Sequence, residues 1–111
     1  MTATSLGETL DRLAATVAER AGADPAQSYT ASLLAGGVQR CAKKLGEEAV
    51  ETALAAVSGD QRALAEETAD LLFHLVVLLQ ASHLSPETVA EALARRRGVS
   101  GHDEKAKRRP E

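Results

Sequence analysis

Aromatic residues and cysteine are nearly absent from this 111-residue sequence, which has one Phe, one Tyr, no Trp and one Cys. The single cysteine, Cys41, cannot form an internal disulfide, and this is typical of proteins from a reducing compartment. The net charge of −3 gives no support for binding to nucleic acid. The longest apolar run, Leu71 to Leu79, is far shorter than the roughly 20 residues that span a membrane. Met1 to Ser5 also lacks the basic and apolar regions of a secretory signal. We therefore predict a cytoplasmic protein that binds neither nucleic acid nor membrane.

Alanine and leucine dominate the composition instead, and both favour helix. The length predicts a single domain over residues 1–111, with a charged C-terminal tail from about residue 100. The fold class that we predict is all-α, with four to five helices in an antiparallel bundle. Apolar residues at helical spacing, together with capping residues, place these helices at 6–21, 29–34, about 38–57, about 61–82 and about 86–97.

Capping residues and one tight turn mark the ends of these helices. Ser5 with Glu8 three residues later is the pattern of a capping box. Between the two long helices, Gly59 is a good residue to end one helix and Asp60 a good residue to cap the next. A connection this short makes the two long helices antiparallel neighbours.

Four carboxylates on the two long helices form the candidate site. Glu48 and Glu51 are three residues apart on the first helix, and Glu67 and Asp70 are three apart on the second, so the members of each pair are surface neighbours. Carboxylates brought together repel one another unless a cation neutralises them. Oxygen ligands favour Mg²⁺, with Mn²⁺ as a substitute. The alternative is that these acids are solvated and pair with lysines, as Lys44 would with Glu48.

Other polar residues near these helices allow two interpretations each. Tyr29 is either a packing residue or a substrate contact, and His74, one turn after Asp70, is either a core residue or a ligand. Arg95 belongs to a run of three arginines that either partner a helix C-terminus or bind phosphate. Lys105 lies in the basic part of the tail.

Three stretches of the sequence together resemble a known enzyme family. They are Ser28-Tyr29-Thr30, Lys44-Leu45-Gly46-Glu47-Glu48-Ala49-Val50-Glu51, and Glu67-Thr68-Ala69-Asp70-Leu71-Leu72-Phe73-His74. They resemble the phosphoribosyl-ATP pyrophosphohydrolases, which belong to the MazG-like all-α nucleotide pyrophosphohydrolases and share the pattern Glu-Glu-x-x-Glu followed by Glu-x-x-Asp. The likeness covers about residues 6–109, and Phe73 stands where the family usually has Tyr.

The resemblance implies hydrolysis of phosphoribosyl-ATP to phosphoribosyl-AMP and pyrophosphate, the second step of histidine biosynthesis. It also implies a Mg²⁺ ion held by the four carboxylates. We expect Glu47 and Glu48 to be the catalytic carboxylates. Glu47 is the candidate for the base, or for a group that supports the metal ligands, because it is next to the ligand pair and four residues before Glu51. The expected substrate contacts are Tyr29, Lys44, His74, Arg95 and Lys105.

We expect the bundle to be completed by dimerisation. Helix 38–57 is apolar around most of its girth, which predicts a largely buried helix, and Leu71 to Leu79 is apolar on every side. Four helices of this length cannot surround both segments, so an obligate homodimer is predicted. Two other functions stay open: a house-cleaning pyrophosphatase acting on dUTP or other NTPs, and a non-catalytic helical dimerisation module. Ser28-Tyr29-Thr30 and the tail argue against the house-cleaning enzyme.

Overall fold

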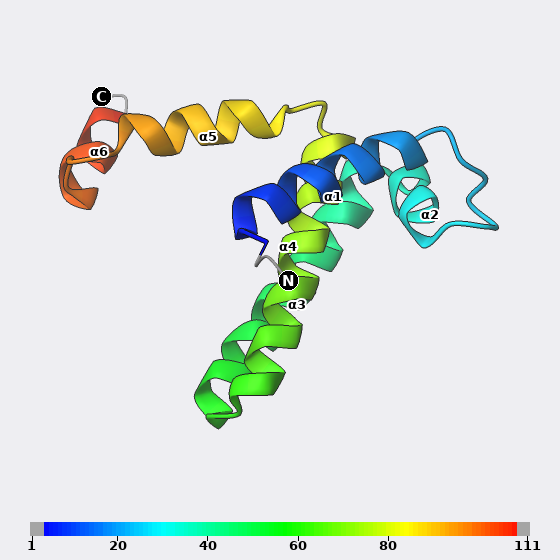
Figure 1. Cartoon of the computed structure of the whole chain (residues 1–111), viewed down its shortest axis with the longest axis horizontal. Helices are drawn as coiled ribbons and strands as arrows, with labels where there is room; N and C mark the ends of the chain where they lie inside the picture. Colours follow the sequence, from blue (N-terminus) through cyan, green and yellow to red (C-terminus); the bar gives the residue numbers. More distant parts are fainter. Residues whose placement is uncertain (1–3, 109–111) are drawn as a thin grey trace.

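Two long helices form an antiparallel hairpin to which the rest of the chain is attached (Figure 1). They belong to a computed structural model that describes residues 4–108, so the ends of the predicted domain and tail, 1–3 and 109–111, lie outside the described residues. Within 4–108 the structure is helical and contains no strand, and this confirms the all-α prediction. The helices are α1 (Leu6–Arg20), α2 (Tyr29–Ala35), α3 (Gly37–Ser58), α4 (Gln61–Ala81), α5 (Pro86–Arg95) and α6 (Gly101–Arg108).

The turn between α3 and α4 has the predicted capping residues. Gly59 ends α3 in the left-handed region, with φ 80°, which glycine adopts without steric cost. Asp60 then caps α4 because its side chain accepts a hydrogen bond from the Ala63 N–H at 3.0 Å. At the other end of the chain, Ser5 accepts from the Glu8 N–H at 3.0 Å and begins α1 as predicted.

A small apolar core holds α1 and α2 against the hairpin. Cys41 is a free, buried cysteine, and its thiol donates to the carbonyl oxygen of Leu33 at 3.3 Å, which joins α3 to α2. The thiol is thus a packing group. The buried members of the core cluster come from α1, α2, α3 and α4 and are Val17, Leu33, Cys41, Val76 and Val77.

Two helices follow α4 and form an arm, α5–α6 (residues 86–108), that extends away from α3 (Figure 1). The bend between α4 and α5 is 110°. Among the described residues, no single helix is long and apolar enough to cross a bilayer, and α4 with α5 meets that test only as this bent pair. The sixth helix, α6, was not predicted because its residues have no apolar periodicity. A local signal was present, since Ser100 accepts from the Asp103 N–H at 3.1 Å.

The surface of the single chain is larger than expected for its length. Its radius of gyration is 16.0 Å, against about 13 Å for a compact domain of this length. Its accessible surface is 8167 Å², against about 5,800 Å² for a compact monomer of this mass. Much of α3 is exposed, including Leu54 at 64% and Val57 at 86%. The prediction that this helix is largely buried is therefore wrong for a single chain.

Candidate metal centre

The hairpin brings three carboxylates from its two helices together. Glu48 projects from α3, and Glu67 and Asp70 project from α4. Each offers one oxygen such that the three atoms all lie within 4.8 Å of one another. Glu51 is not in this group of three. It lies near the group, because after burial it is the next cause of the raised pKa of both Glu48 and Glu67.

The environment of the carboxylates disfavours their charged form. The pKa of Glu48 is raised, first by burial and then by Glu51, with smaller contributions from Asp70 and Glu67. The pKa of Glu67 is also raised, first by burial and then by the negative charges of Glu51 and Asp70. A cation bound between these carboxylates would favour their charged form, and so would offset the effects of burial and of the neighbouring negative charges.

Two buried oxygens in the cluster fit such a cation. Within the described part of the chain, Oε2 of Glu48 and Oε2 of Glu67 are buried and have no hydrogen-bond partner. Buried polar atoms are usually paired, and an unpaired one calls for an explanation such as an ion. Converging carboxylate oxygens are the donor set that hard divalent cations prefer. The residues present therefore fit Mg²⁺ or Mn²⁺.

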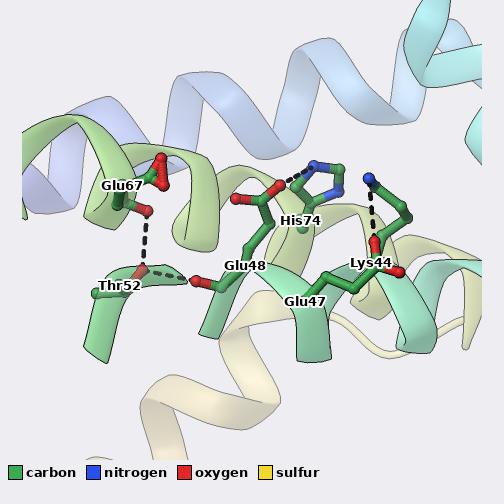
Figure 2. Close-up of polar contacts among 6 residues, drawn as sticks. All are labelled: Lys44, Glu47, Glu48, Thr52, Glu67 and His74. Carbon is green, nitrogen blue, oxygen red and sulfur yellow. Dashed lines mark hydrogen bonds and ion pairs between the residues drawn. The ribbon is translucent and has the colours of Figure 1, made fainter. Parts of the chain in front are cut away.

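His74, also on α4, lies beside the cluster. Its Nε2 lies 3.9 Å from Oε1 of Glu48, and the residue is only 5% exposed (Figure 2). The pKa of His74 is lowered, first by burial and then by the positive charge of Lys44, so the imidazole is neutral at pH 7. Its Nδ1 is buried and has no hydrogen-bond partner among the described residues.

An aromatic group lies beside His74. The ring of Tyr29 stacks on Phe73 with 6.3 Å between centroids, and it meets the His74 ring edge-on at 6.2 Å. Ser28 places Tyr29 there, because its hydroxyl accepts from the Ala31 N–H at 3.1 Å and begins α2. Tyr29 is 55% exposed, so part of an aromatic side chain is available beside His74.

Lys44 and Glu47 form a pair at the side of the cluster. Nζ of Lys44 is 3.3 Å from Oε1 of Glu47 (Figure 2), and this contact raises the pKa of Lys44. The expected pairing of Lys44 with Glu48 is therefore wrong. Lys44 pairs with Glu47 instead, because the side chain of Glu48 points toward α4 and His74. Glu47, the candidate base, is oriented toward the lysine and is not one of the three clustered carboxylates.

The remaining two predicted substrate contacts are on the α5–α6 arm. Arg95 is in the last turn of α5, and Lys105 is in the last turn of α6. In Figure 1, α5 extends away from α3, and α6 lies at the far end of α5, so neither helix lies beside the α3–α4 hairpin at the cluster. Their role in binding stays a prediction.

Thr52 was missed in the sequence analysis. Its Oγ1 lies 2.8 Å from the carbonyl oxygen of Glu48 and 3.1 Å from that of Glu67 (Figure 2). The first contact could have been anticipated, because a threonine commonly bonds to the carbonyl four residues earlier on a helix. The second contact depends on the register between α3 and α4, which the sequence does not contain.

The all-α fold, with carboxylates of an antiparallel helix pair facing one another, has the features expected from the resemblance to the all-α nucleotide pyrophosphohydrolases. A sequence model of the family described as phosphoribosyl-ATP pyrophosphohydrolase matches residues 10–97. The chain belongs to this family, and the resemblance seen in the motifs is confirmed.

Curated relatives align over nearly their whole length. The phosphoribosyl-ATP pyrophosphatase of Methylobacterium radiotolerans is 59% identical over 92% of this chain and 95% of its own. The protein of the same name from Parvibaculum lavamentivorans is 58% identical over 89% of this chain and 91% of its own. That of Azospirillum brasilense is 55% identical over 90% of each.

Proposed function

We propose that this protein hydrolyses phosphoribosyl-ATP between its α and β phosphates, giving phosphoribosyl-AMP and pyrophosphate in the second step of histidine biosynthesis. The observation that carries the proposal is the cluster of Glu48, Glu67 and Asp70 in a chain of the phosphoribosyl-ATP pyrophosphohydrolase family. The relatives named above, each at least 55% identical, support the choice of substrate. Cys41 is a free thiol, which supports the cytoplasm as the compartment.

The proposed cofactor is Mg²⁺, with Mn²⁺ as a substitute, held by Glu48, Glu51, Glu67 and Asp70. When bound, the cation would polarise a phosphoryl oxygen and neutralise charge that develops on the leaving pyrophosphate. The carboxylates of Glu48 and Glu67 are suited to this task because each has a buried oxygen without a hydrogen-bond partner.

The residues around the cluster supply binding and proton transfer. We expect Lys44, which pairs with Glu47 beside the cluster, to meet a substrate phosphate, and Tyr29 offers its exposed ring beside His74. The imidazole of His74 lies beside Glu48, with Nε2 3.9 Å from Oε1. Glu47 is the proposed base that takes a proton from the attacking water.

The substrate has a further phosphate, on the ribose added to the base, and a cation distant from the metal must recognise it. We propose Arg95 and Lys105 for this role, because both lie on the basic α5–α6 arm rather than at the carboxylates. A charge-assisted contact with phosphate is about twice as strong as a neutral hydrogen bond. The arm would then select phosphoribosyl-ATP over ATP.

The functional unit that we propose is a homodimer. The accessible surface of one chain exceeds that of a compact monomer by about 2,300 Å², which is about 4,600 Å² for two chains, and permanent dimers bury about 2,000–5,000 Å² counted over both partners. The exposed apolar side chains of α3, among them Val50, Leu54 and Val57, supply a surface of the apolar kind that such interfaces use.

A pyrophosphate-release assay with Mg²⁺ tests the proposed substrate. Phosphoribosyl-ATP, ATP, dUTP and dCTP are compared at equal concentration, and we expect a clear preference for phosphoribosyl-ATP. A preference for dUTP or dCTP would assign the protein to the house-cleaning pyrophosphatases. If calorimetry detects no binding of a divalent metal, with or without nucleotide, the protein would instead be a non-catalytic dimerisation module.

A further inference from the structure

The side chain of Thr52 crosses from α3 to α4 at the height of the metal centre. Its hydroxyl oxygen is 2.8 Å from the carbonyl oxygen of Glu48 on α3 and 3.1 Å from the carbonyl oxygen of Glu67 on α4 (Figure 2). These two residues also contribute the two less exposed carboxylates of the cluster. One half-buried hydroxyl therefore contacts the backbone of both.

An ordinary helical threonine explains only half of this arrangement. Bonding to the carbonyl four residues earlier accounts for the contact with Glu48. It does not account for the contact with Glu67, which is fifteen residues away in the sequence and on the other helix. A hydroxyl has one proton, which it can donate to either carbonyl or share between them. In each case the two carbonyl oxygens stay within reach of the same atom.

We propose that Thr52 is a positioning residue for the metal centre: its hydroxyl fixes the register of α3 against α4, so that the carboxylates of Glu48 and Glu67 converge on one cation. The proposal rests on the function proposed above. Mg²⁺ accepts little departure from octahedral geometry at 2.0–2.1 Å, so a small slip between the helices would weaken binding. The negative charges themselves push the helices apart before the cation binds, and the Thr52 hydrogen bond opposes that repulsion.

Thr68 is a matched control on the facing helix. It is also a half-buried threonine, and its hydroxyl is 2.6 Å from the carbonyl oxygen of Leu64, four residues earlier on α4. Within residues 4–108, the Thr68 hydroxyl makes no hydrogen bond to α3. Thr68→Val removes one intrahelical hydrogen bond, whereas Thr52→Val removes the same kind of bond together with the contact between helices.

The test measures Mn²⁺ binding to the full-length protein by electron paramagnetic resonance of the free ion, without substrate. We expect Thr52→Val to weaken Mn²⁺ binding by about tenfold, the lower end of the loss seen when a group that orients metal ligands is removed. Thr52→Ser keeps the hydroxyl and should bind within about twofold of wild type, as should Thr68→Val. In turnover, Thr52→Val should need more Mg²⁺ for half-maximal activity and recover kcat at saturation.

Thermal unfolding in EDTA separates positioning from simple helix stability. If Thr52 only packs the helices, Thr52→Val lowers the melting temperature and leaves Mn²⁺ affinity unchanged, and this overturns the proposal. Thr52→Ala is measured in parallel, since alanine has the highest helix propensity and gives a folded hydroxyl-free variant should valine disrupt packing. Wild-type affinity in either folded variant overturns the positioning role alone. A wild-type protein that binds no Mn²⁺ overturns the proposed metal centre and the positioning role with it.

Discussion

Substitution of Leu54 is the sharpest test of the proposed dimer, because the contribution of this side chain to the free energy of dimerisation can be calculated from its exposed fraction. The side chain lies on α3 and is 64% exposed in the single chain. Complete burial of a leucine side chain contributes about 1.5–3 kcal/mol, so burial of the exposed part contributes about 1–2 kcal/mol. A two-fold axis places every interface residue twice. Leu54→Ala should therefore cost about 2–4 kcal/mol per dimer, which raises the dissociation constant by about 30- to 700-fold.

Sedimentation velocity over a dilution series measures this constant directly. Leu93→Ala is the matched control, because Leu93 is 61% exposed but lies on α5, which points away from α3. We expect wild type and Leu93→Ala to remain dimeric at micromolar concentration, where Leu54→Ala dissociates. A wild-type monomer under these conditions would refute the homodimer. Equal dissociation of Leu54→Ala and wild type would refute the placement of α3 at its interface.

Three further predictions concern the carboxylates and the tail. The proposed ligands are Glu48, Glu51, Glu67 and Asp70. Replacing any one of them by its amide should abolish pyrophosphate release and leave the helical circular dichroism intact. Near-normal turnover at saturating Mg²⁺ in two of these four variants would contradict the ligand assignment. Because the pKa of Glu48 and that of Glu67 are raised in the folded protein, these two groups contribute stability to the metal-free protein that is lost as pH rises above the ordinary carboxyl range near 4.5. The lowered pKa of His74 acts in the opposite direction, so the test is a comparison: in thermal unfolding in EDTA between about pH 4.5 and 6.5, Glu48→Gln should lose less stability with rising pH, or gain more, than wild type; identical slopes would exclude Glu48 as a source. Deleting residues 102–111 should lower activity on phosphoribosyl-ATP much more than any trace activity on ATP, and an equal loss on both would remove the tail, with Lys105, from substrate selection.

Local signals in the sequence were sufficient for the helices that make the site. Asp60 and Gly59 fixed the turn, and the turn length fixed the antiparallel direction of α3 and α4. The spacing of the acids put the two members of each pair on one face of their helix, and the structure shows that Glu48, Glu67 and Asp70 meet. Each of these steps depends on neighbours within a few residues, which is the range in which capping and periodicity act.

Features that depend on the register between helices or on a second chain were not predictable in this way. The contact of Thr52 with the Glu67 carbonyl needs the axial position of α4 against α3. Apolar periodicity shows that the face of α3 with Leu54 is suited to burial, but it does not say whether the same chain covers it. The choice of Glu47 over Glu48 by Lys44 depends on side-chain rotamers, and both spacings are favourable on a helix.

The α3–α4 hairpin also has a consequence for how the protein folds. The clustered carboxylates lie between residues 48 and 70, so a short length of chain separates them. Closing a short loop costs little entropy, and contacts between residues close in the sequence form fast. We therefore expect the cluster to assemble when the hairpin closes, before the docking of α1. At that stage the converging acids repel one another, so Mg²⁺ should accelerate refolding in stopped-flow experiments as well as slow unfolding.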